Sequence, residues 1–484
     1  MTTSKRSGVN ATWAALAVAG ALAFGSGQIQ AAATIVINNI NAAGVGFNDP
    51  TAATPVGGNS GTTLGEQRLI AFQYAANLWG ASLTSNQPII INAQFSALSC
   101  TATSGVLGSA GATAAFRNFP NAPKADTLYS YALANKLAGA YLGTLNAPQI
   151  NANFNVNLGN AGCLTGTFFY LGLDGNHGSQ IDFVAVLQHE MGHGLGFQTF
   201  TNGSTGAFNG GFPAIWDHYL FGTTANKTWK DMTAAERVAS AVSLDKLVWT
   251  GSVVNAAVPS VLRFGLAGAT LSGRPLGGGT RLIRVGEASF GQSLGSTALF
   301  GEVKPVAEQT TGAGQGCEPF NAVNARTVYG KIALISRGVC GFTVKVKNAQ
   351  NAGARAVLIA DNVTETAVVP SSLGGSDPTI AILAVRIFQS DGNFLREALK
   401  RGARSASPVF ANIGLVVPQY AGADALGRAQ MYAPSPFQGG SSVSHFDSAM
   451  FRNQLMEPSI NGDLTQSLAP PIDMTLPLLR DTGW

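Results

Sequence analysis

Charged residues are scarce in this sequence, and no run of one sign stands out. Asp, Glu, Lys and Arg make up 11% of the 484 residues, whereas apolar residues make up 46%. A composition this apolar is atypical of disordered chains and is sufficient for a buried core. The 29 basic and 25 acidic residues form no basic block, which argues against a nucleic-acid partner. Internal repeats are also missing, and the length indicates two or three domains at roughly 150 residues each.

Long apolar stretches are missing beyond the N-terminus, which argues against a membrane-spanning helix later in the chain. The apolar stretch at residues 11–24 follows Lys5 and Arg6 and is shorter than the roughly 20 residues that span a bilayer. Ala31 and Ala33 offer small residues for a cleavage site. This pattern predicts a signal peptide over residues 1–33 and a secreted protein, extracellular or periplasmic, with no transmembrane segment in its mature form.

Cysteine is rare as well, with four residues in the chain. Four cysteines allow three pairings, among which locality favours Cys100 with Cys163 and Cys317 with Cys340. No C-x-x-C spacing occurs, which argues against a thiolate metal site. We therefore expect two disulfides, in keeping with an exported protein.

The first half of the chain mixes helical and strand patterns. Thr63 and Glu66 form a capping box before a helix that contains Trp79, and a second capping box begins at Thr233 within a stretch, 216–251, that reads as mostly helical. Ser179 is expected to cap a helix over 179–196. The remaining elements predicted here are strands at 34–38, 88–95, 150–158 (half-exposed) and 168–173, and a helix at 130–142.

The second half has a different pattern. Strands are expected at 331–336 and 356–360 with a helix at 342–352 between them, a βαβ unit typical of a separate small domain. Residues 431–484 are rich in proline and read as mostly loop.

The expected helix at 179–196 carries a motif with clear chemistry. His189 and His193 lie four residues apart, so both imidazoles face one point beside the helix. Two such histidines can bind one zinc ion, and Glu190 can act as general base towards a zinc-bound water. The glycines at 192, 194 and 196 disfavour a long helix and indicate a tight stop beside the metal.

The third ligand is less clear from spacing. In the motif H-E-x-x-H-x-x-G-x-x-H the last histidine would fall at position 199, which is Thr199 here. A catalytic zinc usually takes three protein ligands, so the third must come from elsewhere. The candidates are His177, His218 and His445, with Asp217 as a carboxylate option.

The segment 189–197, followed much later by His445 and Met456, resembles the leishmanolysin-type metzincins. That resemblance implies that His445 is the third ligand to one catalytic Zn²⁺, that Met456 is the Met-turn residue and that Glu190 is the catalytic base. It implies an α+β fold, a metzincin-like two-lobed zinc peptidase domain, built from residues 34–252 and 426–484. An inhibitory pro-segment, usual in that family, has no room between the signal peptide and the catalytic pattern.

The intervening residues 253–425 resemble another known unit. The run Gly330 to Phe342, with Cys340 near its end, is similar to the protease-associated (PA) domain, whose core here spans about 295–420. The resemblance implies a small α/β domain that is not catalytic and that restricts or steers access of substrates.

Together these patterns predict a secreted zinc metalloendopeptidase that acts on proteins or peptides. An extended substrate would pair with an edge strand, for which 150–158 and 168–173 are the candidates. The alternative is a catalytically silent secreted binding protein with a vestigial metal site. An aminopeptidase is a third interpretation, suggested by the PA-like insert, but the H-E-x-x-H helix argues against it.

Overall fold

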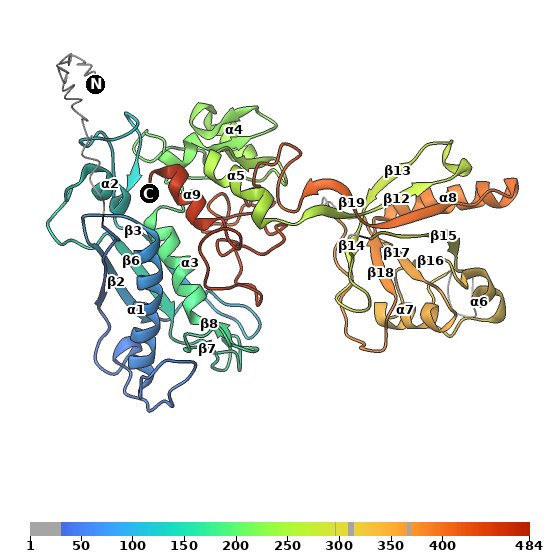
Figure 1. Cartoon of the computed structure of the whole chain (residues 1–484), viewed down its shortest axis with the longest axis horizontal. Coiled ribbons are helices and arrows are strands. Elements are labelled where there is room, and N and C mark those ends of the chain that lie inside the picture. Colours follow the sequence, from blue (N-terminus) through green and yellow to red (C-terminus); the bar gives the residue numbers. More distant parts are fainter. Residues whose placement is uncertain (1–30, 296, 308–313, 365–368) are drawn as a thin grey trace, which may run out of the picture.

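A computed structural model describes residues 31–295, 297–307, 314–364 and 369–484. The chain forms two bodies connected by a pair of strands (Figure 1). The first body contains the segments before Phe264 and after Tyr420, and the second contains the residues between them. Almost all of the expected signal peptide lies outside the described residues and stays a prediction. Within the described part, no helix combines the length and the apolar character needed to cross a bilayer.

A four-stranded sheet organises the first body. Its order is β1-β2-β6-β3, in which β1 (Ile35–Asn39), β2 (Ile89–Ser96) and β6 (Ile150–Asn155) are parallel and β3 (Gly108–Ala112) is antiparallel. Helices α1 (Leu64–Ser82) and α3 (Phe183–Leu195) pack against each other beside this sheet. The capping box that begins α1 is confirmed, since Thr63 accepts from the Glu66 N–H and the Glu66 carboxylate accepts from the Thr63 N–H.

Neither of the two strands proposed to pair with an extended substrate lies at an edge of this sheet. β6 lies between β2 and β3, so the expectation that 150–158 is a half-exposed edge is wrong. Its asparagines are polar but paired: Asn153 accepts from the Ser96 hydroxyl and Asn155 donates to the Val106 carbonyl. The other candidate, β7 (Phe169–Tyr170), pairs only with β8 (Ile181–Asp182) among the described strands. The edge strands of the sheet are β1 and β3, and β3 is the one that lies beside α3.

The helix that carries the histidines begins later than expected. Because Ile181 and Asp182 form β8, α3 starts at Phe183 and not at Ser179. Asp182 caps it, accepting a hydrogen bond from the Val184 N–H at 2.9 Å. The expected helix at 130–142 is also shorter, since α2 (Tyr131–Ala138) ends at Gly139 with a φ of 68°.

Residues 216–251 are not mostly helical as expected. They contain a three-stranded sheet of β10, β9 and β11, two 3-10 turns and one short helix, α4 (Ala234–Ser240). The second capping box is confirmed at the start of α4. The chain stays in the first body through α5 (Ser252–Val261), which packs against α9 (Thr475–Thr482), so it leaves this body later than the expected boundary at 253. The other elements are β9 (Leu220–Gly222), β10 (Lys227–Thr228), β11 (Leu247–Trp249) and the turns Ile215–His218 and Trp229–Asp231.

The second body is built on an eight-stranded mixed sheet with the order β13-β12-β19-β15-β16-β17-β18-β14. Alternate residues of its central strands face two separate apolar cores, one against α8 (Gln389–Ser405) and one against α7 (Phe342–Asn351). The expected βαβ unit is confirmed as β16, α7 and β17. The strands are β12 (Phe264–Ser272), β13 (Arg281–Arg284), β14 (Gly286–Glu287), β15 (Leu299–Pro305), β16 (Ile332–Ser336), β17 (Ala356–Ala360), β18 (Leu383–Ile387) and β19 (Phe410–Tyr420), with a further short helix α6 (Ala322–Val328).

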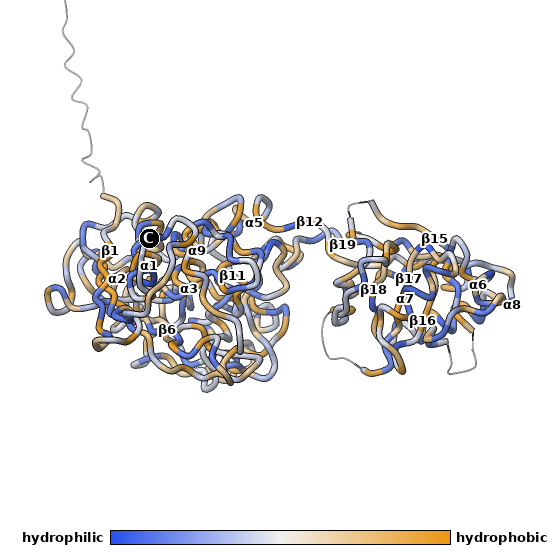
Figure 2. The backbone as a smooth tube through the Cα atoms, turned by 90° about the horizontal axis from the view of Figure 1, so that it is seen from below, coloured by the Kyte–Doolittle hydropathy of each residue, from blue (hydrophilic) through white to orange (hydrophobic). Residues whose placement is uncertain are grey.

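The connection between the bodies is narrow (Figure 2). β12 leads into the second body and β19 leads back, and the two strands pair along most of their length. At their base the Ala421 N–H donates to the Arg263 carbonyl at 2.9 Å. The two ends of the insert therefore lie next to each other on the first body.

Candidate metal centre

Three histidines converge at one point of the first body. α3 presents His189 and His193 one helical turn apart, and His445 approaches them from a loop of the C-terminal segment. Their Nε2 atoms lie 3.2 Å (His189–His193), 3.1 Å (His193–His445) and 3.3 Å (His189–His445) apart. The structure thus brings together residues that are more than 250 positions apart in the sequence.

Backbone carbonyls fix the tautomer of each ring. His189 Nδ1 lies 2.7 Å from the Leu455 carbonyl, His193 Nδ1 2.8 Å from that of Phe197, and His445 Nδ1 2.8 Å from that of Ser441. A carbonyl can only accept, so each Nδ1 carries the proton. All three Nε2 atoms then present lone pairs towards one another, an arrangement that a cation between them would stabilise.

Burial keeps these imidazoles neutral. It lowers the pKa of His189 to about 4 and that of His193 to about 3, and it lowers the pKa of His445 as well. The rings are between 4% and 9% exposed. Neutral imidazoles with free Nε2 atoms are the form that binds a transition metal.

The triangle of Nε2 atoms fits zinc. Tetrahedral ligands at 2.0–2.1 Å from one ion lie about 3.4 Å apart, close to the separations found here. Among the described residues, this is the one group of at least three His, Cys, Asp or Glu side chains that could hold a metal ion. Three imidazoles leave a fourth position open, as in catalytic zinc sites.

Glu190 lies beside the histidines, beneath the edge strand β3. A Cβ atom added to Gly108 would lie 3.0 Å from Glu190 Cγ, so the strand passes directly over this side chain. Burial raises the pKa of Glu190 to about 8, against a hydrogen bond from the Ala110 backbone that lowers it. Glu190 can therefore both hold and release a proton near neutral pH.

Met456 lies under the helix, in contact with Gly192. A Cβ at Gly192 would come within 2.8 Å of Met456 Sδ, and one at Gly194 within 2.4 Å of Ile150 Cγ2. The expected tight stop thus applies to Gly196 alone, which ends the helix with a φ of 126°. Gly192 and Gly194 instead allow close packing of the helix on the Met456 loop and on β6.

The other candidate ligands lie outside the triangle. Asp217 is fully buried and accepts hydrogen bonds from Thr199 and Thr201. The His218 ring contacts the Thr127 hydroxyl through Nε2, and His177 contacts the Gln180 carbonyl through Nδ1. None of these three belongs to the group that could hold a metal ion.

A cleft of about 1150 Å³ runs past the histidines and Glu190. Of the described residues that line it, Glu190 is the only Asp, Glu, Lys or Arg, and most of the others are small, hydroxylated or apolar. Its walls include β3 with the loop before it, the segment after α3 and the segment that leads to His445. These wall segments are 103–110, 198–204 and 437–445, and residues 458–460 also line the cleft.

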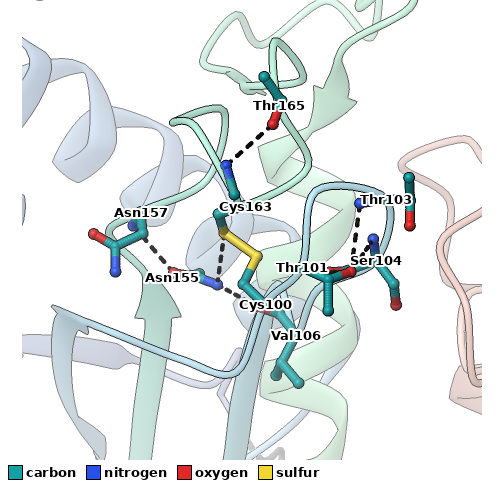
Figure 3. Close-up of a disulfide and its surroundings, with 10 residues drawn as sticks. Cys100, Thr101, Thr103, Ser104, Val106, Asn155, Asn157, Cys163 and Thr165 are labelled. Atoms are coloured by element: carbon teal, nitrogen blue, oxygen red, sulfur yellow. Dashed lines mark hydrogen bonds between the residues drawn. A yellow bond between two sulfur atoms is a disulfide. The ribbon is translucent and has the colours of Figure 1, made fainter.

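Both expected disulfides are present, and one borders this cleft. Cys317 pairs with Cys340 in the second body, and Cys100 pairs with Cys163 in the first. The Cys100–Cys163 bond holds the loop that contains Ser104, and Asn155 joins the two sides by donating to Cys163 Sγ and to the Val106 carbonyl (Figure 3). The loop wall of the cleft is thus covalently attached to the segment after β6.

Sequence reasoning missed β3 and its part in the site. The strand reads Gly-Ser-Ala-Gly-Ala, with no β-branched or aromatic residue and no apolar alternation. Its only signal is the pair of glycines, which can mark a close backbone approach. The carbonyl groups that orient the imidazoles carry no sequence signal at all.

Comparison with known proteins identifies part of the second body. Residues 302–395 match the PA domain family, so the insert contains a PA domain as expected. Vacuolar-sorting receptor 5 of Arabidopsis thaliana is 43% identical over 92 residues, 18% of this chain and 15% of that protein. Signal peptide peptidase-like 4 of Oryza sativa subsp. japonica is 37% identical over 86 residues, 18% of this chain and 15% of its own. The chain spans only 14% to 22% of the length of the curated relatives it matches.

Solved structures match more weakly. BSAP, a zinc aminopeptidase from Bacillus subtilis, is 22% identical over 41% of each chain, with a TM-score of 0.22. An aminopeptidase from Aneurinibacillus sp. strain AM-1 is 22% identical over 33% of this chain and 36% of its own, with a TM-score of 0.21. At these TM-scores the matches carry no argument about the first body or its metal centre.

Proposed function

We propose that this protein is a secreted zinc metalloendopeptidase of the leishmanolysin-like metzincin type. The observation that carries the proposal is the convergence of three histidine Nε2 atoms, with Glu190 beside them, in a cleft of about 1150 Å³. The metzincin assignment is supported by the position of Met456 beneath α3 and by an edge strand above Glu190.

His189, His193 and His445 would hold the ion. Zinc, when bound, supplies a Lewis acid that polarises a carbonyl and makes water a stronger acid. Glu190 takes the proton from the attacking water and passes it to the leaving amine, a double role that suits a carboxyl group whose pKa is raised towards neutrality. The Ala110 N–H is a candidate to hold Glu190 in place during this transfer.

The backbone of β3 supports cleavage within a chain rather than at its end. Leu107 accepts a hydrogen bond from the Asn155 N–H of β6 and Thr113 donates one to the Gln149 carbonyl just before β6, so by the alternation of a strand the N–H and C=O groups of Gly108 and Ala110 point away from β6. With the Ala110 N–H directed to Glu190, the N–H and C=O of Gly108 and the C=O of Ala110 can pair with an extended peptide on both sides of the scissile bond. The absence of any charged group other than Glu190 among the described lining residues favours a peptide segment without charged side chains near that bond.

A single variant separates an active enzyme from a silent binding protein. Glu190→Gln keeps the three imidazoles and should retain zinc, while hydrolysis should fall at least about a thousandfold because the general base is lost. The measurements are zinc content by mass spectrometry and cleavage of internally quenched peptides blocked at both ends. A wild-type protein that binds zinc and cleaves none of these peptides contradicts the proposal, and cleavage restricted to peptides with a free amino terminus favours an aminopeptidase.

The PA domain is proposed to modulate access of substrates. β12 and β19 connect it to the first body at a point of the chain between His193 and His445, and it contributes no residue to the described lining of the cleft. Such an arrangement is compatible with a steering role and leaves the chemistry to the first body.

A further inference from the structure

Asp217 is a buried carboxylate that the proposed reaction does not use. Its relative exposure is 0%, and burial raises its pKa against several hydrogen bonds that lower it. Burial of a carboxylate is costly unless its oxygens are well paired. Asp217 accepts from the hydroxyls of Thr199 at 2.7 Å and Thr201 at 2.5 Å, and from the Ala214 N–H at 2.8 Å.

Two of these partners belong to the cleft. Thr199 and Thr201 lie in segment 198–204, which follows α3 and forms one wall. The third partner, Ala214, belongs to a part of the scaffold that is bonded to Leu128 through Ile215. Asp217 therefore joins the cleft wall to the fixed part of the first body.

The same wall touches the loop that carries His445. The Thr199 N–H donates to the Ser444 hydroxyl at 3.3 Å, one residue before His445. Thr199 occupies the position at which the compact zinc motif would place its third histidine, so in this chain no metal bond restrains the segment after α3. The hydrogen bonds of Thr199 and Thr201 to Asp217 restrain the segment at this position, together with the bond from Thr199 to Ser444.

We infer that Asp217 is a positioning residue that fixes wall 198–204 for the binding of peptide substrates. The inference rests on the proposed function, because the wall matters only if the cleft binds a peptide. A carboxylate can only accept, so both threonine hydroxyls direct their hydrogens towards Asp217. The Thr199 hydroxyl also accepts from the Thr201 N–H at 3.0 Å, and the acceptor capacity that the two hydroxyls retain suits the N–H groups of an extended peptide.

The test compares Asp217→Ala and Asp217→Asn with wild type. Asp217→Ala frees both threonines, so KM for a blocked quenched peptide should rise about tenfold while kcat stays within about threefold. Zinc content should stay at one ion per chain. Asp217→Asn keeps one accepting oxygen and should restore much of the affinity, and it remains informative if the alanine variant folds poorly.

Asp361→Asn is the matched control, since Asp361 is a buried carboxylate of the second body far from the cleft lining. It should lower stability without a change of KM. An unchanged KM in a folded Asp217 variant overturns the inference, as does loss of zinc, which would make Asp217 part of the metal centre instead.

Peptide binding separates this inference from the proposed function. In the Glu190→Gln background, the Kd of the same blocked peptide is measured by fluorescence polarisation with and without Asp217→Asn. A Kd raised severalfold by the second change supports the positioning role even if wild type proves inactive. An equal Kd, or no binding by either protein, overturns it.

Discussion

At the scale of single residues, the metal centre depends on backbone groups that orient the imidazoles as well as on the imidazoles themselves. Each imidazole is held by one carbonyl, from Leu455, Phe197 or Ser441, and these carbonyls decide that Nε2 is the free nitrogen. Groups of this kind affect metal affinity strongly because they fix both ring orientation and tautomer.

His445→Ala should abolish stable zinc binding. The variant removes one of three ligands and leaves two imidazoles on α3, so affinity should fall by more than about a hundredfold. The measurement is zinc content after dialysis against a weak chelator.

His218→Ala is the matched control for that variant, because His218 contacts Thr127 and lies outside the triangle. It should retain zinc at the wild-type level. Retention of zinc by His445→Ala would instead place the third ligand elsewhere.

At the scale of elements, α3 is shaped by what lies against it. Glycine at 194 lets the helix approach β6, and Ala at this position would press on three carbon atoms of the Ile150 side chain. The same close approach holds the helix against the sheet whose edge strand passes over Glu190. A substitution at Gly194 therefore tests the packing of α3 on β6 without altering any of the three proposed zinc ligands.

Gly194→Ala should lower the free energy of unfolding by about 1–3 kcal/mol, because overpacking in a close-packed core is costly. Adding Ile150→Ala removes the atoms in conflict, so the effect of Gly194→Ala should be much smaller in that background. Chemical denaturation of wild type, the two single variants and the double variant gives the coupling free energy between the two positions. Additive effects would show that the contact is not the cause.

The PA sheet carries an ionic group at the ends of its parallel strands. Asp361, which follows β17, accepts from Arg386 in β18 and from Arg337 after β16. Burial alone would raise the pKa of Asp361, but the hydrogen bonds from Arg386 and Arg337 outweigh it and hold the pKa at about 2. The charged form is therefore favoured in the folded protein.

Asp361→Asn should destabilise the PA domain by about 3 kcal/mol at neutral pH, because the hydrogen bonds from Arg386 and Arg337 lose a buried, negatively charged acceptor. The folded pKa lies below the ordinary value of 3.8, so the contribution is complete above about pH 4 and is lost as the pH falls towards 2. Unfolding of both proteins by denaturant across this range should show the difference shrinking at low pH. A difference that is the same at pH 6 and pH 2.5 would contradict this account.

At the scale of the whole molecule, the two bodies have separate cores. The buried cluster of the first body takes its members from residues 33–262 and 423–479, and the second body has two clusters of its own. Because Arg263 and Ala421 are hydrogen-bonded neighbours, the insert begins and ends at one point of the first body. Few contacts should be lost there if the insert is removed.

Replacing residues 264–420 by a short Gly-Ser linker should leave a folded first body that binds zinc. Cleavage of short blocked peptides should stay within about threefold of wild type, because no residue of the insert is among the described residues that line the cleft. Cleavage of a folded protein substrate should change more than that if the PA domain controls access. Loss of zinc binding in this variant would show that the insert supports the metal centre directly.

Much of this protein is determined by the sequence at short range. The capping boxes at Thr63 and Thr233, the spacing of His189, Glu190 and His193, and the βαβ unit around Cys340 all depend on neighbours within a few residues, where side-chain type and backbone geometry are directly coupled. Both disulfides join the cysteines that are nearest to each other in the sequence, as expected. The resemblance to known families supplied His445 and Met456, which spacing alone left open.

Only the tertiary structure decided the rest, because the deciding contacts join distant segments. Strand β3 is made of small residues and gains its place from pairing with β6 and from room above Glu190. Residues 216–251 look mostly helical in isolation, but they form three short paired strands around one short helix, α4. The sequence left Asp217 open as a third metal ligand. In the structure its carboxylate instead accepts hydrogen bonds from the Thr199 and Thr201 hydroxyls of the cleft wall.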